Sequence, residues 1–233
     1  NYQRSIELNP KFEVAYVHLA NTRFRLGQYR EAIATFQRYV DVAPSEFERS
    51  RGYDAIAYVY LRKGDLAASK RFASESVKLR KDAVGISYQI AAKSGDKRVA
   101  ALLEKTILAT FVANERGARG NRRFEPYYRG VIALNNERNE EAVEYFRQAI
   151  THAGPGWNIQ DLEDCLGEAL LGLGRYDEAI EEFKRIIRLA PNYPLANYNL
   201  AKAYQGKGMY DDARSAFLRF LDLWRNADRD IPE

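Results

Sequence analysis

A short motif that joins a glycine to a small residue five positions later recurs along the chain and constrains the fold more than any other feature. It occurs at residues 27–32, 64–69, 174–179 and 208–213. Prolines keep a related spacing, since Pro10 and Pro44 are 34 residues apart and each follows an apolar-periodic segment where a helix should stop. A period near 34 residues is typical of stacked helical units that bury their apolar faces on their neighbours. The sequence therefore predicts an all-α solenoid.

Composition supports a folded chain. Hydrophobic residues make up 46% of the sequence and charged residues 29%, which is enough apolar material for a continuous core. The apolar stretch at 53–61 is far shorter than a membrane-spanning helix requires, so we expect no membrane span. Cys165 is the only cysteine, which excludes a disulfide within the chain and a cysteine-rich zinc site. It fits a reducing compartment such as the cytoplasm, but the first residue is not Met and localisation stays open.

Residues at fixed places in the repeat resemble those of the tetratricopeptide repeat (TPR) family. In that family each repeat is an antiparallel helix pair with small residues at positions 8 and 20, a large one at 24 and proline at 32. Between 13 and 46 these positions hold Ala20, Ala32, Phe36 and Pro44, and between 160 and 193 they hold Gly167, Ala179, Phe183 and Pro191. The resemblance implies a right-handed superhelical solenoid of TPR-like helical hairpins.

The repeat frame covers residues 1–233 as a single solenoid. Residues 1–12 are expected to be half a repeat whose first helix is missing. Full repeats are expected at 13–46, 50–83, 123–156, 160–193 and 194–227, and a degenerate repeat with a short first helix at 84–115. Tyr39 is a large ring at position 27, where small residues are usual, so we expect irregular packing there.

Catalytic chemistry is not indicated. The two histidines, His18 and His152, fall in repeats that are not adjacent, and no glycine-rich phosphate-binding loop follows a strand. Glu181 and Glu182 fall on a second helix, where a solvated outer face is the expected reading. We expect no catalytic site, no metal site and no cofactor.

The family resemblance implies a concave groove lined by first-helix positions 2, 5, 6, 9, 12 and 13. Side chains at these positions mix cations, hydrogen-bond donors and aromatic rings, which suits a protein partner or an extended peptide. The candidate peptide-binding residues are His18, Asn21, Arg25, Arg51, Tyr58, Arg62, Tyr88, Gln89, Tyr127, Tyr128, Asn199 and Lys202.

Charge is unevenly distributed and leaves a second function class open. Residues 1–123 hold 23 Lys and Arg against 13 Asp and Glu, whereas the remainder holds 13 against 19. Four arginines lie at 116–123 in a glycine-rich linker that could contact phosphates. A nucleic-acid-associated or transcription-regulatory repeat domain is therefore the alternative to a non-catalytic scaffold, although a solvated loop is the preferred reading of the linker.

Both ends of the chain carry further expectations. The stretch 217–233 resembles repeat regions of bacterial multidomain signalling or enzymatic proteins, so we expect this scaffold to belong to a larger protein. Helices left uncovered at the two ends of the solenoid would allow self-association.

Overall fold

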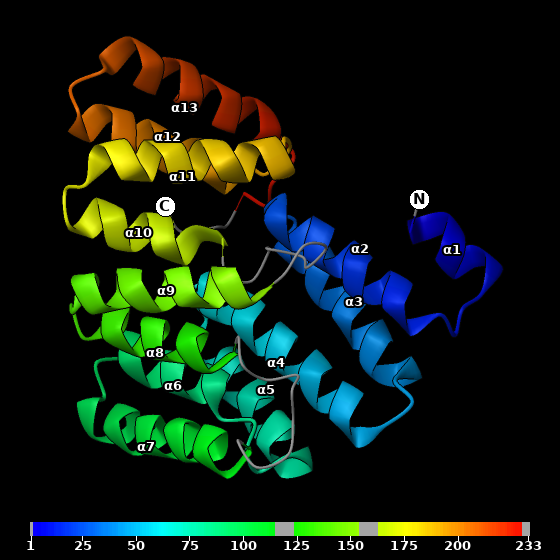
Figure 1. Ribbon diagram of the computed structural model, residues 1–233. Coiled ribbons are helices and arrows are strands. Elements are labelled where there is room, and N and C mark those ends of the chain that lie inside the picture. The colour runs from blue at the N-terminus through cyan, green and yellow to red at the C-terminus, as the bar shows by residue number, and fades with distance from the viewer. Residues whose placement is uncertain (1, 115–123, 154–162, 230–233) are drawn as a thin grey trace. The chain divides into compact units, whose positions relative to one another are not determined.

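The structure is a computed structural model that describes residues 2–114, 124–153 and 163–229. Within these ranges the chain forms helices and no strand, which confirms the all-α class. Consecutive helices pack as antiparallel pairs joined by short turns (Figure 1). The helices are α1 (Tyr2–Leu8), α2 (Glu13–Arg25), α3 (Tyr29–Val42), α4 (Glu46–Arg62), α5 (Leu66–Leu79), α6 (Gly85–Lys93), α7 (Lys97–Asn114), α8 (Phe124–Asn135), α9 (Asn139–Ala153), α10 (Glu163–Gly172), α11 (Tyr176–Leu189), α12 (Pro194–Gly206) and α13 (Tyr210–Trp224).

The chain divides into two compact units. Unit 1 comprises residues 1–107 together with 226–233, and unit 2 comprises residues 108–225, so the boundary falls within α7. Unit 1 therefore holds α1 to α6 and the segment that follows α13. Unit 2 holds α8 to α13. The division into individual repeats stays a prediction.

Glycine ends the first helix of several pairs in a backbone conformation that other residues rarely adopt. Gly27 has a φ of 73° and Gly174 a φ of 68°, in the left-handed region that glycine enters without a steric penalty. The Gly27 amide donates to the Phe24 carbonyl at 3.0 Å, and the next amide, of Gln28, donates to Arg23 at 2.9 Å. These bonds satisfy carbonyls at the end of α2, so the recurrent glycine of the sequence motif is a helix terminator.

Small residues inside each pair let the two helices approach closely. A Cβ added at Gly167 of α10 would lie 2.3 Å from the ring of Phe183 on α11. A Cβ at Gly130 of α8 would likewise lie 2.6 Å from Phe146 on α9. Both phenylalanines have no exposed surface. The small residue at position 8 and the aromatic at position 24 thus form one interlocking contact in unit 2.

The large ring at Tyr39 is accommodated by the helix that follows it. A Cβ at Gly52 of α4 would approach Val40 within 2.5 Å and the Tyr39 ring within 3.0 Å. Tyr39 itself is only 4% exposed and packs with Ile6, Ala15 and Tyr16. The missing side chain at Gly52 therefore offsets the extra volume of Tyr39.

Helix α4 begins four residues before the start of its predicted repeat at residue 50. Ser45 is its N-cap, accepting a hydrogen bond from the Glu48 amide at 3.3 Å, and the Ser45 hydroxyl contacts the Glu48 carboxylate. The Ser45 side chain thus caps the first turn, and the spacing of Ser45 and Glu48 is that of a capping box. The additional turn brings Ser50 into the α4–α5 interface.

Candidate peptide-binding surface

In unit 1, two of the sequence-predicted residues meet at the ends of α2 and α4. The Tyr58 ring lies 5.5 Å from the ring of Phe24, which stacks at 5.4 Å on Tyr29. Arg62 donates a hydrogen bond to the Tyr29 hydroxyl. We call Phe24, Tyr29, Tyr58 and Arg62 the aromatic–cation cluster.

Electrostatics at the aromatic–cation cluster centre on Tyr29. Burial raises the pKa of its hydroxyl, and the Arg62 guanidinium acts in the opposite direction, whereas the Asp228 carboxylate raises the pKa further. Arg62 and Asp228 are therefore both close enough to influence the same hydroxyl. Lys93 of α6 adds a second cation near this end of α4, because its Nζ donates to the Leu61 carbonyl at 3.0 Å.

The remaining candidates in unit 1 are spread along the first helices. His18 is half-buried and stacks on Tyr2 with ring centroids 5.1 Å apart. Arg51 is exposed on α4, seven residues before Tyr58 and thus on the same side of that helix. Asn21, Arg25 and Gln89 are half-buried. These positions leave side-chain surface that a ligand could contact.

Two candidates are placed in the interior instead. Tyr88 is 2% exposed and Asn199 is 8% exposed. Their side chains contribute to packing within units 1 and 2, respectively. A ligand on either unit could contact these two side chains only after they had moved out of the interior. The candidate binding surface therefore excludes Tyr88 and Asn199.

In unit 2 the candidates take part in aromatic clusters. Tyr127 and Tyr128 lie 5.4 Å apart, edge to face, and Tyr128 also lies 5.8 Å from Phe111. Lys202 is exposed, with its Nζ 5.7 Å from the ring centroid of Tyr198. The candidates of unit 2 thus include rings and one lysine but no arginine, whereas those of unit 1 include three arginines.

Sequence reasoning missed Phe24, Tyr29 and Asp54. Phe24 occupies repeat position 12 and Asp54 position 5, both of which belong to the implied groove lining. The positions themselves were therefore a sufficient signal, although the candidate set included neither residue. Tyr29 opens a second helix, and no groove position marks it.

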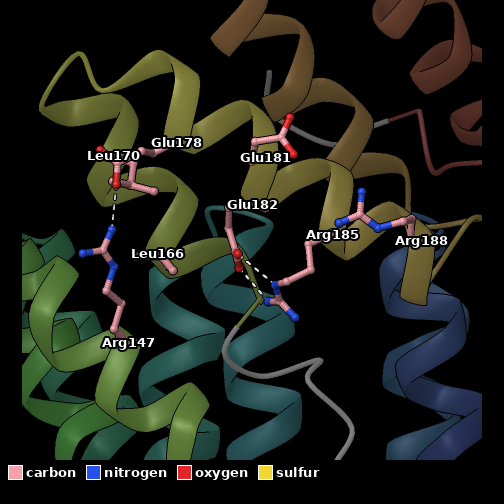
Figure 2. Close-up of a pocket in the computed structure, with 8 residues that line it drawn as sticks. All are labelled: Arg147, Leu166, Leu170, Glu178, Glu181, Glu182, Arg185 and Arg188. Atoms are coloured by element: carbon pink, nitrogen blue, oxygen red, sulfur yellow. Dashed lines mark hydrogen bonds and ion pairs between the residues drawn. The ribbon is translucent and has the colours of Figure 1, made fainter.

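A charged cavity of about 360 Å³ lies elsewhere in unit 2, among α9, α10 and α11. Figure 2 shows Leu166 and Leu170 beside ion pairs. Arg147 Nη2 lies 2.7 Å from Glu178, and Arg185 Nη2 lies 2.6 Å from Glu182. The Glu178 pKa is lowered, chiefly because Arg175 donates a hydrogen bond to it. The cavity is lined by Arg147, Leu166, Leu170, Glu178, Glu181, Glu182, Arg185 and Arg188.

The ion pairs of this cavity correct one sequence interpretation. Glu182 was expected on a solvated face, yet its side chain is only 10% exposed because Arg185 covers and neutralises it. Glu181 is exposed, as expected. Since most charges in the cavity satisfy one another, it resembles a structural ion-pair network more than a binding site.

The described residues form neither a cluster of metal ligands nor a membrane-spanning helix. Among residues 2–114, 124–153 and 163–229, no group of three or more His, Cys, Asp or Glu side chains is arranged to hold a metal ion. No helix within those ranges is long and apolar enough to cross a membrane. The arginine-rich linker at 116–123 lies outside the described residues.

Family comparisons agree with this architecture. A model described as a TPR repeat matches residues 167–208, and three tetratricopeptide repeat models match residues 1–34, 127–151 and 195–227. Together these spans cover about half of the sequence. The chain belongs to the tetratricopeptide repeat family.

Curated relatives share only part of this TPR chain. The peroxisomal targeting signal receptor of Eremothecium gossypii is 29% identical over 98 residues, which are 40% of this chain and 16% of the receptor. The human intraflagellar transport protein 88 homolog is 27% identical over 104 residues, or 43% of this chain and 12% of that protein. The matches thus span less than a fifth of either relative's length.

Solved structures show the same fold at low sequence identity. The Cut9–Hcn1 hetero-tetramer of APC/C gives a TM-score of 0.60 at 16% identity, covering 98% of this chain and 43% of the matched chain. PilF from Pseudomonas aeruginosa gives 0.51 at 17% identity, covering 78% of each chain. At such identities the likeness concerns the helical repeat fold.

Proposed function

We propose that this TPR chain is a non-catalytic scaffold that binds a protein or extended peptide in a concave groove formed by its first helices. The aromatic–cation cluster is the observation that carries the proposal. It presents the half-buried rings of Phe24 and Tyr58 beside the exposed Arg62, while Tyr29 lies buried beneath them. Arg51 adds a second guanidinium on the same side of α4. Guanidinium groups bind carboxylates with charge-assisted hydrogen bonds, and rings supply apolar contact area.

Family membership supports the same class of function. One curated relative is named as a receptor for a targeting signal, which is a role in recognising another polypeptide. Applied to this chain, that role would be served by cations and rings in unit 1, with an acidic or backbone-exposed peptide as ligand. The larger protein to which the chain belongs would determine the pathway.

The proposal can be tested with a phage-displayed random peptide library selected against the purified chain. The variant Arg51→Gln/Tyr58→Leu/Arg62→Gln should lose at least about tenfold in affinity for the selected peptides, since it removes two cations and one ring. Arg38→Gln/Lys70→Gln is the matched control, because it removes two exposed cations from the second helices α3 and α5. It should bind the peptides as the unmodified chain does.

Folding of each variant is checked by its circular-dichroism melting curve. Equal affinity of the triple variant and the control would refute the proposed surface. If the library yields no binding peptide while single-stranded DNA binds with a steep salt dependence, the nucleic-acid alternative replaces the peptide-binding proposal.

A further inference from the structure

Helix α3 is capped by a residue distant in sequence. Its own N-cap residue, Gln28, makes no side-chain capping bond. Instead the amide of Arg30, the second residue of α3, donates to Oδ2 of Asp228 at 2.9 Å across 198 positions of sequence. The side chain of an N-cap residue normally accepts from the second or third amide of its helix. Asp228 therefore performs at α3 the role that Asp65 performs locally at α5, where it accepts from the Ala68 amide at 2.9 Å.

The same aspartate makes a second bond with its backbone. The Asp228 amide donates to the Gly27 carbonyl at 3.0 Å. Gly27 and Arg30 thus contact both polar ends of one residue, as expected when a peptide segment is recognised by main chain and side chain together. Asp228 and Ala227 are half-buried in this arrangement. The segment 226–229 is accordingly part of unit 1.

The turn lies next to the aromatic–cation cluster. Tyr29 is between Gly27 and Arg30 in sequence, and its hydroxyl is influenced by both Arg62 and Asp228. The partial positive charge at the start of α3 and the nearby guanidinium of Arg62 both favour a carboxylate. The start of α3 thus binds the Asp228 carboxylate through the Arg30 amide, the Gly27 carbonyl accepts from the Asp228 amide, and Arg62 places a positive charge near the same turn.

We propose that the turn Gly27–Arg30 is a docking site for an aspartate-containing segment, and that residues 226–229 of this chain occupy it as an internal ligand. The proposal deepens the function given above and rests on it in one respect, since an acidic partner segment reaching the cluster must displace Asp228. Its chemistry defines the partner: a segment with an aspartate whose own amide is free to donate.

The contact is tested first in the intact chain. Asp228→Ala removes the side-chain acceptor and leaves the main chain in place. In ¹⁵N-resolved NMR spectra the Arg30 amide should shift and exchange with solvent faster by at least about threefold, since it loses its capping acceptor. Asp212→Ala, which alters an exposed acid in the first turn of α13, is the control that loses an equal charge and leaves the Arg30 amide unchanged. An Arg30 amide unaffected by Asp228→Ala would overturn the proposal.

Docking is then measured with a synthetic peptide of residues 225–233, RNADRDIPE, titrated to millimolar concentration into the full chain. The Asp228→Ala chain should bind the peptide about tenfold more tightly than the unmodified chain, because its internal competitor is weakened. The same peptide with Ala at the position of Asp228 should bind at least about fivefold more weakly. Equal affinities of both chains, or no binding to either, would refute internal occupancy. Neither result depends on library-selected peptides, so failure here is distinguishable from failure of the proposed scaffold function.

Discussion

At the residue scale, Asp54 is the most unusual charged group in the described part of the chain. It projects into the α4–α5 interface, where Ser76 donates a hydrogen bond to it and its Oδ1 has no partner among the described residues. Burial is the main cause that raises the pKa of this carboxyl to about 6, whereas Arg80 and Arg51 act to lower it. The folded chain therefore holds a proton that the unfolded chain releases near pH 4.

This difference gives stability a definite pH dependence. Because the folded-state pKa is the higher one, the free energy of unfolding falls as pH rises from about 4 through about 6, by roughly 2–3 kcal/mol. We expect Asp54→Asn to remove this component and to raise stability at about pH 7.5. Urea unfolding at about pH 4.5 and about pH 7.5 measures it, with Asp41→Asn on the exposed side of α3 as control. Parallel pH profiles for the two variants would contradict the assignment.

Gly167 provides a second test at this scale. Adding a methyl group there forces the ring of Phe183, which has no exposed surface, to move. We expect Gly167→Ala to lower the free energy of unfolding by about 1–3 kcal/mol through overpacking. Gly172→Ala in the same helix is the control. Its Cβ would meet only the side chain of half-buried Asn139, so the gain in helix propensity of up to about 1 kcal/mol should offset any clash. Thermal unfolding of both variants decides between these outcomes.

At the scale of elements, helix α5 depends on a single local cap. Asp65 accepts a hydrogen bond from the Ala68 amide, the third residue of α5. We expect Asp65→Ala to lower the free energy of unfolding by about 1 kcal/mol and Asp65→Asn to cost much less, since asparagine is also a good N-cap. Chemical denaturation measures both. Equal losses would mean that the charge of Asp65 matters and the cap does not.

The helix pairs and their turns were predictable because they are encoded locally. Gly27 ends a helix, and Ala20 lets the two helices of a pair pack closely. Both roles follow from side-chain size within one repeat. The early start of α4 was also readable, because Ser45 and Glu48 have capping-box spacing. The burial of Tyr88 and Asn199 could not be predicted in this way. Whether a given repeat position is buried depends on which side chains of the neighbouring helix pack against it.

The contact of Asp228 could not have been read from the sequence either. No periodic pattern connects it with Gly27 and Arg30, and a single aspartate after a helix is usually solvated. The aromatic–cation cluster was half predictable: Tyr58 and Arg62 came from the groove positions, whereas Tyr29 lies outside them. Contacts between segments that are distant in the sequence can be identified only from the structure.

At the scale of the whole molecule, exposed apolar residues on α13 bear on solubility. Leu218 is 57% exposed and Leu221 is 59% exposed, on the final helix of unit 2. Apolar surface of this kind favours self-association, which the sequence also led us to expect.

Sedimentation equilibrium over a wide concentration range tests that expectation. Leu218→Gln/Leu221→Gln should shift any monomer–oligomer equilibrium toward monomer by at least about tenfold. Leu8→Gln/Leu102→Gln, which alters two exposed leucines of unit 1, separates an effect of α13 from a general gain in solubility. If the unmodified chain is monomeric at every concentration, these leucines have no role in assembly.

The α4–α5 pair differs from the others in having three buried serines. The hydroxyl of Ser69 donates to the Ala57 carbonyl at 2.7 Å, and the hydroxyls of Ser50 and Ser76 lie 2.8 Å apart. Sliding one helix along the other by a turn would leave these hydroxyls unpaired in a dry interface, at a cost of about 1–3 kcal/mol each. A slip between helices that are held by apolar contacts leaves no such hydroxyl unpaired. Under a pulling force along the chain, this hairpin should therefore resist shear as a stiff segment, while extension is taken up by the pairs around it.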